Sequence, residues 1–271
     1  MKARLYVDGV SLWAPALPGW EAAAPALRSP TWAASTAPVA RPAARLLEGG
    51  ERRRAPDSVL VALEVGEQAV AQSGLDPAGL ASVFASAHGD LAIVDALCTT
   101  LAANPLLLSP TRFHHSVHNA ASGYWAIATG CHAPSSAVAA YEHSFALGWL
   151  EAAALCIADE RPVLLVATET EARGALASVH HSCGLLGVAL VLAPRRGPVS
   201  RWQFDAVADA AAATPGVPSH PAARALAGNA LAQALPLFEA LAGNIEAQIR
   251  LPLGAGPGLA LRLTPLAPAG A

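Results

Sequence analysis

Apolar and polar positions follow two kinds of spacing along this chain. Short apolar runs, rich in Val, Leu and Ala and bounded by Gly, Pro or Asp, are typical of buried strands. Longer segments repeat apolar residues at helical spacing or are apolar all round, as expected for core helices. Strands are therefore predicted over residues 4–13, 81–86, 135–140, 163–167, 184–192 and 258–263. Helices are predicted over residues 58–74, 92–102, 145–158 and 222–241, and one further apolar helix ends at Gly130.

The order of these elements predicts an α/β layered fold. Strands alternate with helices from residue 58 onward, and strands that are apolar on both sides indicate a sheet covered on both faces. Residues 14–57 form a Pro/Ala-rich connection with many turn signals, which is typical of a surface excursion or a lid. Residues 196–271 are too few for a second domain like the first.

Composition narrows the class of protein. Of the 271 residues, 54% are apolar and 14% are charged, yet no apolar run approaches the roughly 20 residues that span a bilayer. The net charge of -3 argues against nucleic-acid binding through a basic face. The four cysteines are scattered without a CxxC pair, which favours reduced thiols and a cytoplasmic location.

The sequence carries few motifs of direct chemistry. It contains no GxSxG elbow, no P-loop and no GxGxxG segment after a strand. His114, His115 and His118 are either a metal site or a His-rich loop whose rings are hydrogen-bonded in the core. No metal is expected, because no Asp, Glu or Cys lies within the ten residues upstream to complete a coordination set. His180 and His181 are interpreted in the same way, and no cofactor is expected.

One long stretch resembles a known family. The segments SPTRF (109–113), VHNAASG (117–123), CHAP (131–134) and SSAVAAY (135–141) are followed by a helix from His143, the turn ADERP and the strand VLLVA. Together they resemble, in the same order, the β-ketoacyl-ACP synthases of fatty-acid and polyketide synthesis. The spacing from Asn119 to Val166 is kept without a gap. The resemblance covers roughly residues 4–195.

The resemblance implies a thiolase-like layered αβα fold with the first half intact and the second half abbreviated. Residues 1–195 would form the ketosynthase-like N-terminal domain, and residues 196–271 an abbreviated segment packed on it.

Two departures from the family pattern bear on activity. The alignment places Glu142 where active synthases carry their nucleophilic Cys, and a carboxylate cannot replace a thiolate as the acyl acceptor. A competing alignment makes Cys131 the nucleophile, eleven residues earlier, but loses the turn and strand at 159–167. The tail holds a single histidine, His220, and neither of the family's two histidine motifs. Alone, the chain is not expected to catalyse condensation.

The resemblance is closest to chain-length-factor-like partners, and more narrowly to the short ketosynthase-like proteins of aryl polyene and xanthomonadin-type pigment clusters. It implies a dimer with a catalytic ketosynthase or with a second copy, and transient contact with an acyl carrier protein. Tyr124, Phe145 and Trp149 are candidates for lining an acyl tunnel, with core packing as the other interpretation. By analogy, the strand that pairs across the dimer axis consists of Ser135, Ser136, Ala137, Val138, Ala139, Ala140 and Tyr141.

A second hypothesis stays open. The chain could be a stand-alone acyl-thioester enzyme on the same fold, a hydrolase, decarboxylase or acyltransferase. Its reacting group would be Cys131, Glu142 or a nearby histidine, because a carboxylate in an apolar site has a raised pKa and can act as a base.

Overall fold

The computed structural model describes residues 2–34, 41–212, 214 and 216–267. The strands are β1 (Lys2–Trp13), β2 (Ala81–Ala85), β3 (Ser135–Val138), β4 (Val163–Glu169), β5 (Leu186–Ala193), β6 (Trp202–Ala212), β7 (Ala247–Pro252) and β8 (Pro257–Pro265). The α-helices are α1 (Trp20–Leu27), α2 (Gly49–Arg54), α3 (Asp57–Ser73), α4 (Leu91–Ala103), α5 (Pro110–Ser116), α6 (Ala120–Thr129), α7 (Ser144–Ala158), α8 (Pro221–Arg224) and α9 (Leu235–Gly243). Single turns of 3₁₀ helix are η1 (Pro77–Gly79), η2 (Pro105–Leu107), η3 (Tyr141–His143), η4 (Gly174–Ser178) and η5 (Ala230–Ala234).

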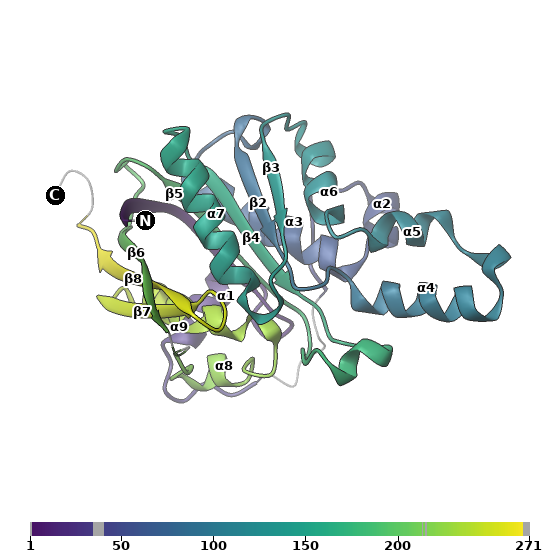
Figure 1. Cartoon of the computed structure of the whole chain (residues 1–271). Coiled ribbons are helices and arrows are strands. Elements are labelled where there is room, and N and C mark those ends of the chain that lie inside the picture. Colours follow the sequence, from purple (N-terminus) through teal and green to yellow (C-terminus); the bar gives the residue numbers. More distant parts are fainter. Residues whose placement is uncertain (1, 35–40, 213, 215, 268–271) are drawn as a thin grey trace.

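All eight strands form one sheet in the order β3-β2-β4-β5-β1-β6-β8-β7. The strands β3, β2 and β4 are parallel, and every other neighbouring pair is antiparallel. The strand β3 therefore forms one edge of the sheet, and the C-terminal strands continue the sheet on the far side of β1 (Figure 1).

Helices cover both faces of the central strands. Along β4, Leu164 and Val166 belong to a core cluster with α3 and α6, whereas Leu165 and Ala167 belong to the cluster on the other face. The second cluster holds α7, α1 and α9. Because both faces of β4 are buried, its sequence is continuously apolar over residues 163–167, as predicted for a covered sheet. Within the described residues, no helix has the length and apolarity that crossing a membrane requires.

The C-terminal segment differs from its prediction. The helix predicted over residues 222–241 is broken into α8, η5 and α9. The break follows from Asn229, whose side-chain oxygen accepts a hydrogen bond from the Leu231 N–H at 3.0 Å and starts a new turn. Two strands, β6 and β7, were not predicted. The sequence of β6 is rich in Ala, and β7 is short and ends in Pro, so both give a weak strand signal.

Three further features of the structure differ from the predictions. The connection over residues 14–57 contains the helices α1 and α2. The helix α5 was not predicted, although Ser109 caps it by accepting from the Arg112 N–H and Pro110 occupies its first position. The strand predicted from Ser135 to Ala140, and extended to Tyr141 by analogy, ends at Val138.

Candidate functional site

Polar residues gather where β2, β3 and β4 end. Parallel strands present their carboxyl ends at one side of a sheet, and the loops there are the usual place for function in α/β folds. These loops are residues 86–90 after β2 and 139–143 after β3, and β4 ends there with Thr168 and Glu169. We call this region the carboxyl-end site.

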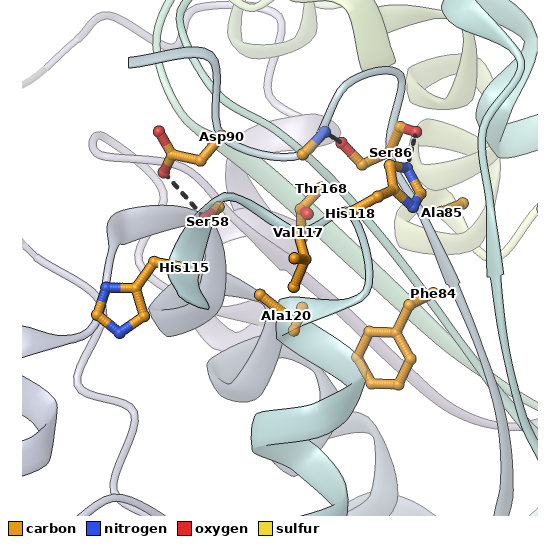
Figure 2. Close-up of a pocket in the computed structure, with 12 residues that line it drawn as sticks. Ser58, Phe84, Ala85, Ser86, Asp90, His115, Val117, His118, Ala120 and Thr168 are labelled. Carbon is orange, nitrogen blue, oxygen red and sulfur yellow. Dashed lines mark hydrogen bonds between the residues drawn. The ribbon is translucent and has the colours of Figure 1, made fainter. Parts of the chain in front are cut away.

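The loop after β2 is fixed by local hydrogen bonds. Gly89, at φ 69°, donates its N–H to Ser86 Oγ at 2.9 Å. Asp90 accepts from Ser58 Oγ at 2.9 Å and from the Ile93 N–H at 3.1 Å, which caps α4. Figure 2 shows these side chains around a cavity of about 20 Å³, which is enough for one water molecule.

Two of the three histidines near α5, His115 and His118, make hydrogen bonds in separate places. His118 Nε2 donates to the Ser86 carbonyl at 2.8 Å (Figure 2). His115 is buried, and its Nε2 shares a 2.8 Å hydrogen bond with the Tyr124 hydroxyl. Burial lowers the pKa of His115, so the neutral ring is favoured. His114 is exposed, and the described residues contain no group of three or more side chains that could hold a metal ion.

A second ring cluster joins the loop after β2 to the turn after β3. The rings of His88 and His180 are 4.5 Å apart, and those of His88 and Tyr141 are 5.3 Å apart, both edge to face. Burial lowers the pKa of both histidines, and the negative charge of the Glu142 carboxylate opposes this shift in His180. Both Nε2 atoms are buried without a hydrogen-bond partner among the described residues. Neutral imidazoles of this kind can accept a proton. His181, next in sequence, is exposed.

The turn after β3 connects the edge strand to α7. Tyr141 adopts a left-handed backbone with φ 49°, which costs energy in a residue with a bulky side chain. Ser144 Oγ stabilises the turn by accepting from the Ala140 N–H at 2.9 Å and donating to the Tyr141 carbonyl at 2.7 Å. The side chain of Glu142 is 64% exposed and lies 3.8 Å from His143 Nε2. An anionic group thus occupies this strand-to-helix turn.

Glu169 is a member of the site that the sequence did not predict. The predicted strand ended at Ala167, whereas β4 continues through Glu169, which is 4% exposed. Its carboxyl accepts a hydrogen bond from the Ala87 N–H. Burial raises the pKa of Glu169 from 4.5 to about 8. The signal in the sequence that could have revealed this residue is a glutamate that closely follows the apolar run of the strand.

Cys131 lies at the opposite end of the sheet from Glu142. Its buried thiol donates to the carbonyl of Leu80 at 3.5 Å, and Leu80 immediately precedes β2. Glu142 follows the carboxyl end of β3, which runs parallel to β2. The structure therefore does not bring the two candidate reacting groups together.

The other cysteines also lie outside these loops. Burial raises the pKa of Cys156, on α7, to about 12, which makes its thiol a poor nucleophile. Cys98, on α4, and Cys183, before β5, are exposed. None of the four thiols sits in the loops after β2 and β3.

The three aromatic tunnel candidates occupy two separate cores. Phe145 and Trp149, on α7, are buried against Phe238 and Phe204, with ring centroids 6.2 and 5.8 Å apart. Tyr124, on α6, belongs to the cluster on the other face of the sheet. They do not line one common space in this structure.

Comparison with known proteins identifies the family. Residues 21–249 match the sequence model described as the N-terminal domain of β-ketoacyl synthases. The chain belongs to the β-ketoacyl synthase family. The match begins in the connection before α2 and extends beyond residue 195, into β7. No curated protein matches the sequence.

Solved structures share the fold of this β-ketoacyl synthase family chain. The complex of the ketosynthase ApeO with its chain length factor ApeC from Xenorhabdus doucetiae contains a chain 23% identical, with TM-score 0.72 over 96% of this chain and 98% of that one. The type II polyketide synthase complex AntDE:AntF gives 13% identity and TM-score 0.73, over 98% and 100%. The ishigamide ketosynthase/chain length factor gives 15% and 0.66, over 98% and 100%. These similarities confirm the predicted thiolase-like αβα fold.

Proposed function

We propose that this chain is a non-condensing, chain-length-factor-like subunit that pairs with a catalytic β-ketoacyl synthase. The observation that carries the proposal is the turn after β3, where the side chain is the exposed carboxylate of Glu142 and no thiol is present. A carboxylate that accepted an acyl group from a thioester would form a mixed anhydride, which is too reactive to hold the chain. Condensation therefore depends on the partner's thiolate.

The edge strand supports the pairing. Ser82 and Ser86 of the β2 side donate their N–H groups to the carbonyls of Pro134 and Val138, at 3.0 and 3.1 Å. Backbone groups alternate in direction along a strand, so those of Ala137 point away from the sheet. Such an edge can accept a strand from another chain.

The proposal extends to the pathway. Chains of similar fold occur in complexes of a ketosynthase with its chain length factor, and the sequence resembles the short members of aryl polyene and xanthomonadin-type clusters. We propose that this chain belongs to a cluster of that type, with an acyl carrier protein as a transient partner of the complex. A cytoplasmic location stays a prediction.

The test is complex formation. The chain would be co-expressed with a ketosynthase encoded beside its gene, and the molar mass of the purified species would be measured by light scattering. A stable one-to-one complex is expected, and Ala137→Pro should abolish it by removing an outward N–H, whereas Ala137→Ser should not. A homodimer that ignores the ketosynthase would contradict the proposal.

The second hypothesis keeps one specific observation in its favour. His180 is a buried imidazole whose pKa is lowered by burial and raised in opposition by the negative charge of Glu142, and a neutral imidazole of this kind is able to serve as a general base. This hypothesis is tested by measuring whether the isolated homodimer hydrolyses an acyl-carrier thioester. It is correct if hydrolysis occurs and if Glu142→Gln and His180→Gln each reduce the rate more than tenfold.

A further inference from the structure

A cavity of about 760 Å³ lies where β6 begins beside β1. The paired part of the two strands ends with Val7 and Trp202, whereas β1 continues to Trp13. The cavity is lined by Asp8, the residue after this last pair, and by residues 198–202, which lead into β6. Cavities of this size are usual for small-molecule sites.

One part of the lining is apolar and aromatic. Trp20 and Ala24, on α1, pack against the core cluster that contains Trp202 and Leu241, and all four residues line the cavity. Trp202 is 5% exposed, and its buried Nε1–H has no acceptor among the described residues. Because a buried donor without a partner costs free energy, a ligand oxygen that accepts from this N–H would bind favourably.

The charged residues of the lining are Arg28, Arg201 and Asp8. Both arginines are exposed, and neither forms an ion pair with a described residue. The backbone of Arg201 is held in place, because its N–H donates to the Val7 carbonyl at 3.2 Å and its carbonyl accepts from the Leu266 N–H at 2.8 Å. With Asp8 ionised, the lining carries one net positive charge, which fits a ligand with a single negative charge.

We infer that this cavity binds a carboxylate carried on an aromatic ring system. The guanidinium groups of Arg28 and Arg201 match a carboxylate in charge and in planar shape, and the indole rings of Trp20 and Trp202 offer apolar surface to a ring. A phosphate ester carries up to two negative charges, more than this lining balances, and a neutral ligand would gain nothing from the two cations. The strands β1 and β6 are separated from the edge strand β3 by β2, β4 and β5, so this site is distinct from the proposed pairing surface.

Calorimetric titration of the full chain with naphthoate tests the site. We expect one-to-one binding, and binding at least ~10-fold weaker for naphthylmethanol, which has the same rings without the charge. Arg28→Gln and Arg201→Gln change exposed side chains, so the chain should fold, which circular dichroism checks, and each should weaken naphthoate binding about 10-fold. The matched control, Arg250→Gln, removes an exposed arginine of β7 that does not line the cavity and should bind like the wild type.

Several outcomes would overturn this inference. If Arg28→Gln and Arg201→Gln both bind naphthoate like the wild type, the ligand binds elsewhere, and if Arg250→Gln loses as much affinity as they do, only the net charge of the chain matters. If the wild type binds no naphthoate, or binds inorganic phosphate more tightly, the stated class of ligand is wrong. None of these titrations contains a ketosynthase, so the proposed function stands or fails separately.

Discussion

Glu169 gives the clearest prediction for a single residue. Its folded-state pKa of about 8 lies above the usual 4.5, so the folded chain holds the proton more tightly than the unfolded chain. As pH rises from about 4.5 to 8, the unfolded state ionises first and the free energy of unfolding falls, then levels off. Each pKa unit corresponds to about 1.4 kcal/mol, so the total is a few kcal/mol. Chemical denaturation at several pH values measures it.

The substitution that tests this pH dependence is Glu169→Gln. The amide oxygen can still accept from the Ala87 N–H, but the side chain no longer titrates, so the fall in stability over this pH range should shrink. Glu171→Gln, at an exposed carboxylate paired with Arg173, is the control and should keep the wild-type profile. An unchanged pH profile in Glu169→Gln would show that another group titrates.

At the same scale, the sequence located the turn after β3 but not its geometry. The resemblance drew attention to Glu142, and the structure places that carboxylate in the turn. The strained backbone belongs to the preceding Tyr141. The neighbours of this turn, His88 and His180, come from loops 53 and 39 residues away in the numbering of the chain. No local pattern could bring them together.

At the scale of elements, the contact between β1 and α3 depends on Gly9. A Cβ atom at this position would lie 1.9 Å from the carbonyl oxygen of Ala69, on the backbone of α3. Gly9→Ala should therefore force the helix away from the sheet and cost about 3 kcal/mol or more in the free energy of unfolding.

Gly123→Ala is the matched control. This glycine lies in α6, where a Cβ would meet no atom within 4 Å, so the substitution should stabilise the chain by about 0.5–1 kcal/mol. Thermal and urea denaturation of both variants measure the difference. Equal stability of Gly9→Ala and the wild type would mean that α3 can move at no cost.

Elements with strong periodicity were predicted well, and short or Ala-rich ones were not. The strands β2 and β4 and the helix α3 carry continuous apolar or helical patterns, so burial alone fixes their type. In β6, the alternation of Trp202, Gln203, Phe204 and Asp205 is clear, but the rest of the strand is largely alanine. Pairing with β1 and β8 makes it a strand.

At the scale of the whole molecule, residues 196–271 complete the core. Phe204 packs on Trp149 of α7, and Phe238 packs on Phe145. The strand β6 also pairs with β1 over six residues, from Lys2 to Val7. A fragment ending at residue 195 would leave these side chains and the edge of β1 uncovered.

We therefore expect the fragment 1–195 to lack cooperative unfolding and to bind a hydrophobic dye strongly. The full chain serves as the reference for both measurements. Cooperative unfolding of the fragment would show instead that the first 195 residues are an independent domain.

The layered α/β class, the position of most core elements and the family resemblance all follow from the amino-acid sequence alone, because hydrophobic periodicity and motif order are local properties of the chain. The folded chain is needed to see that Cys131 and Glu142 lie at opposite ends of the sheet, that Tyr124 is separated from Phe145 and Trp149, and that the C-terminal strands continue the same sheet. These facts depend on strand order and on which face each helix covers. Contacts between distant segments fix both, and spacing along the chain does not encode them.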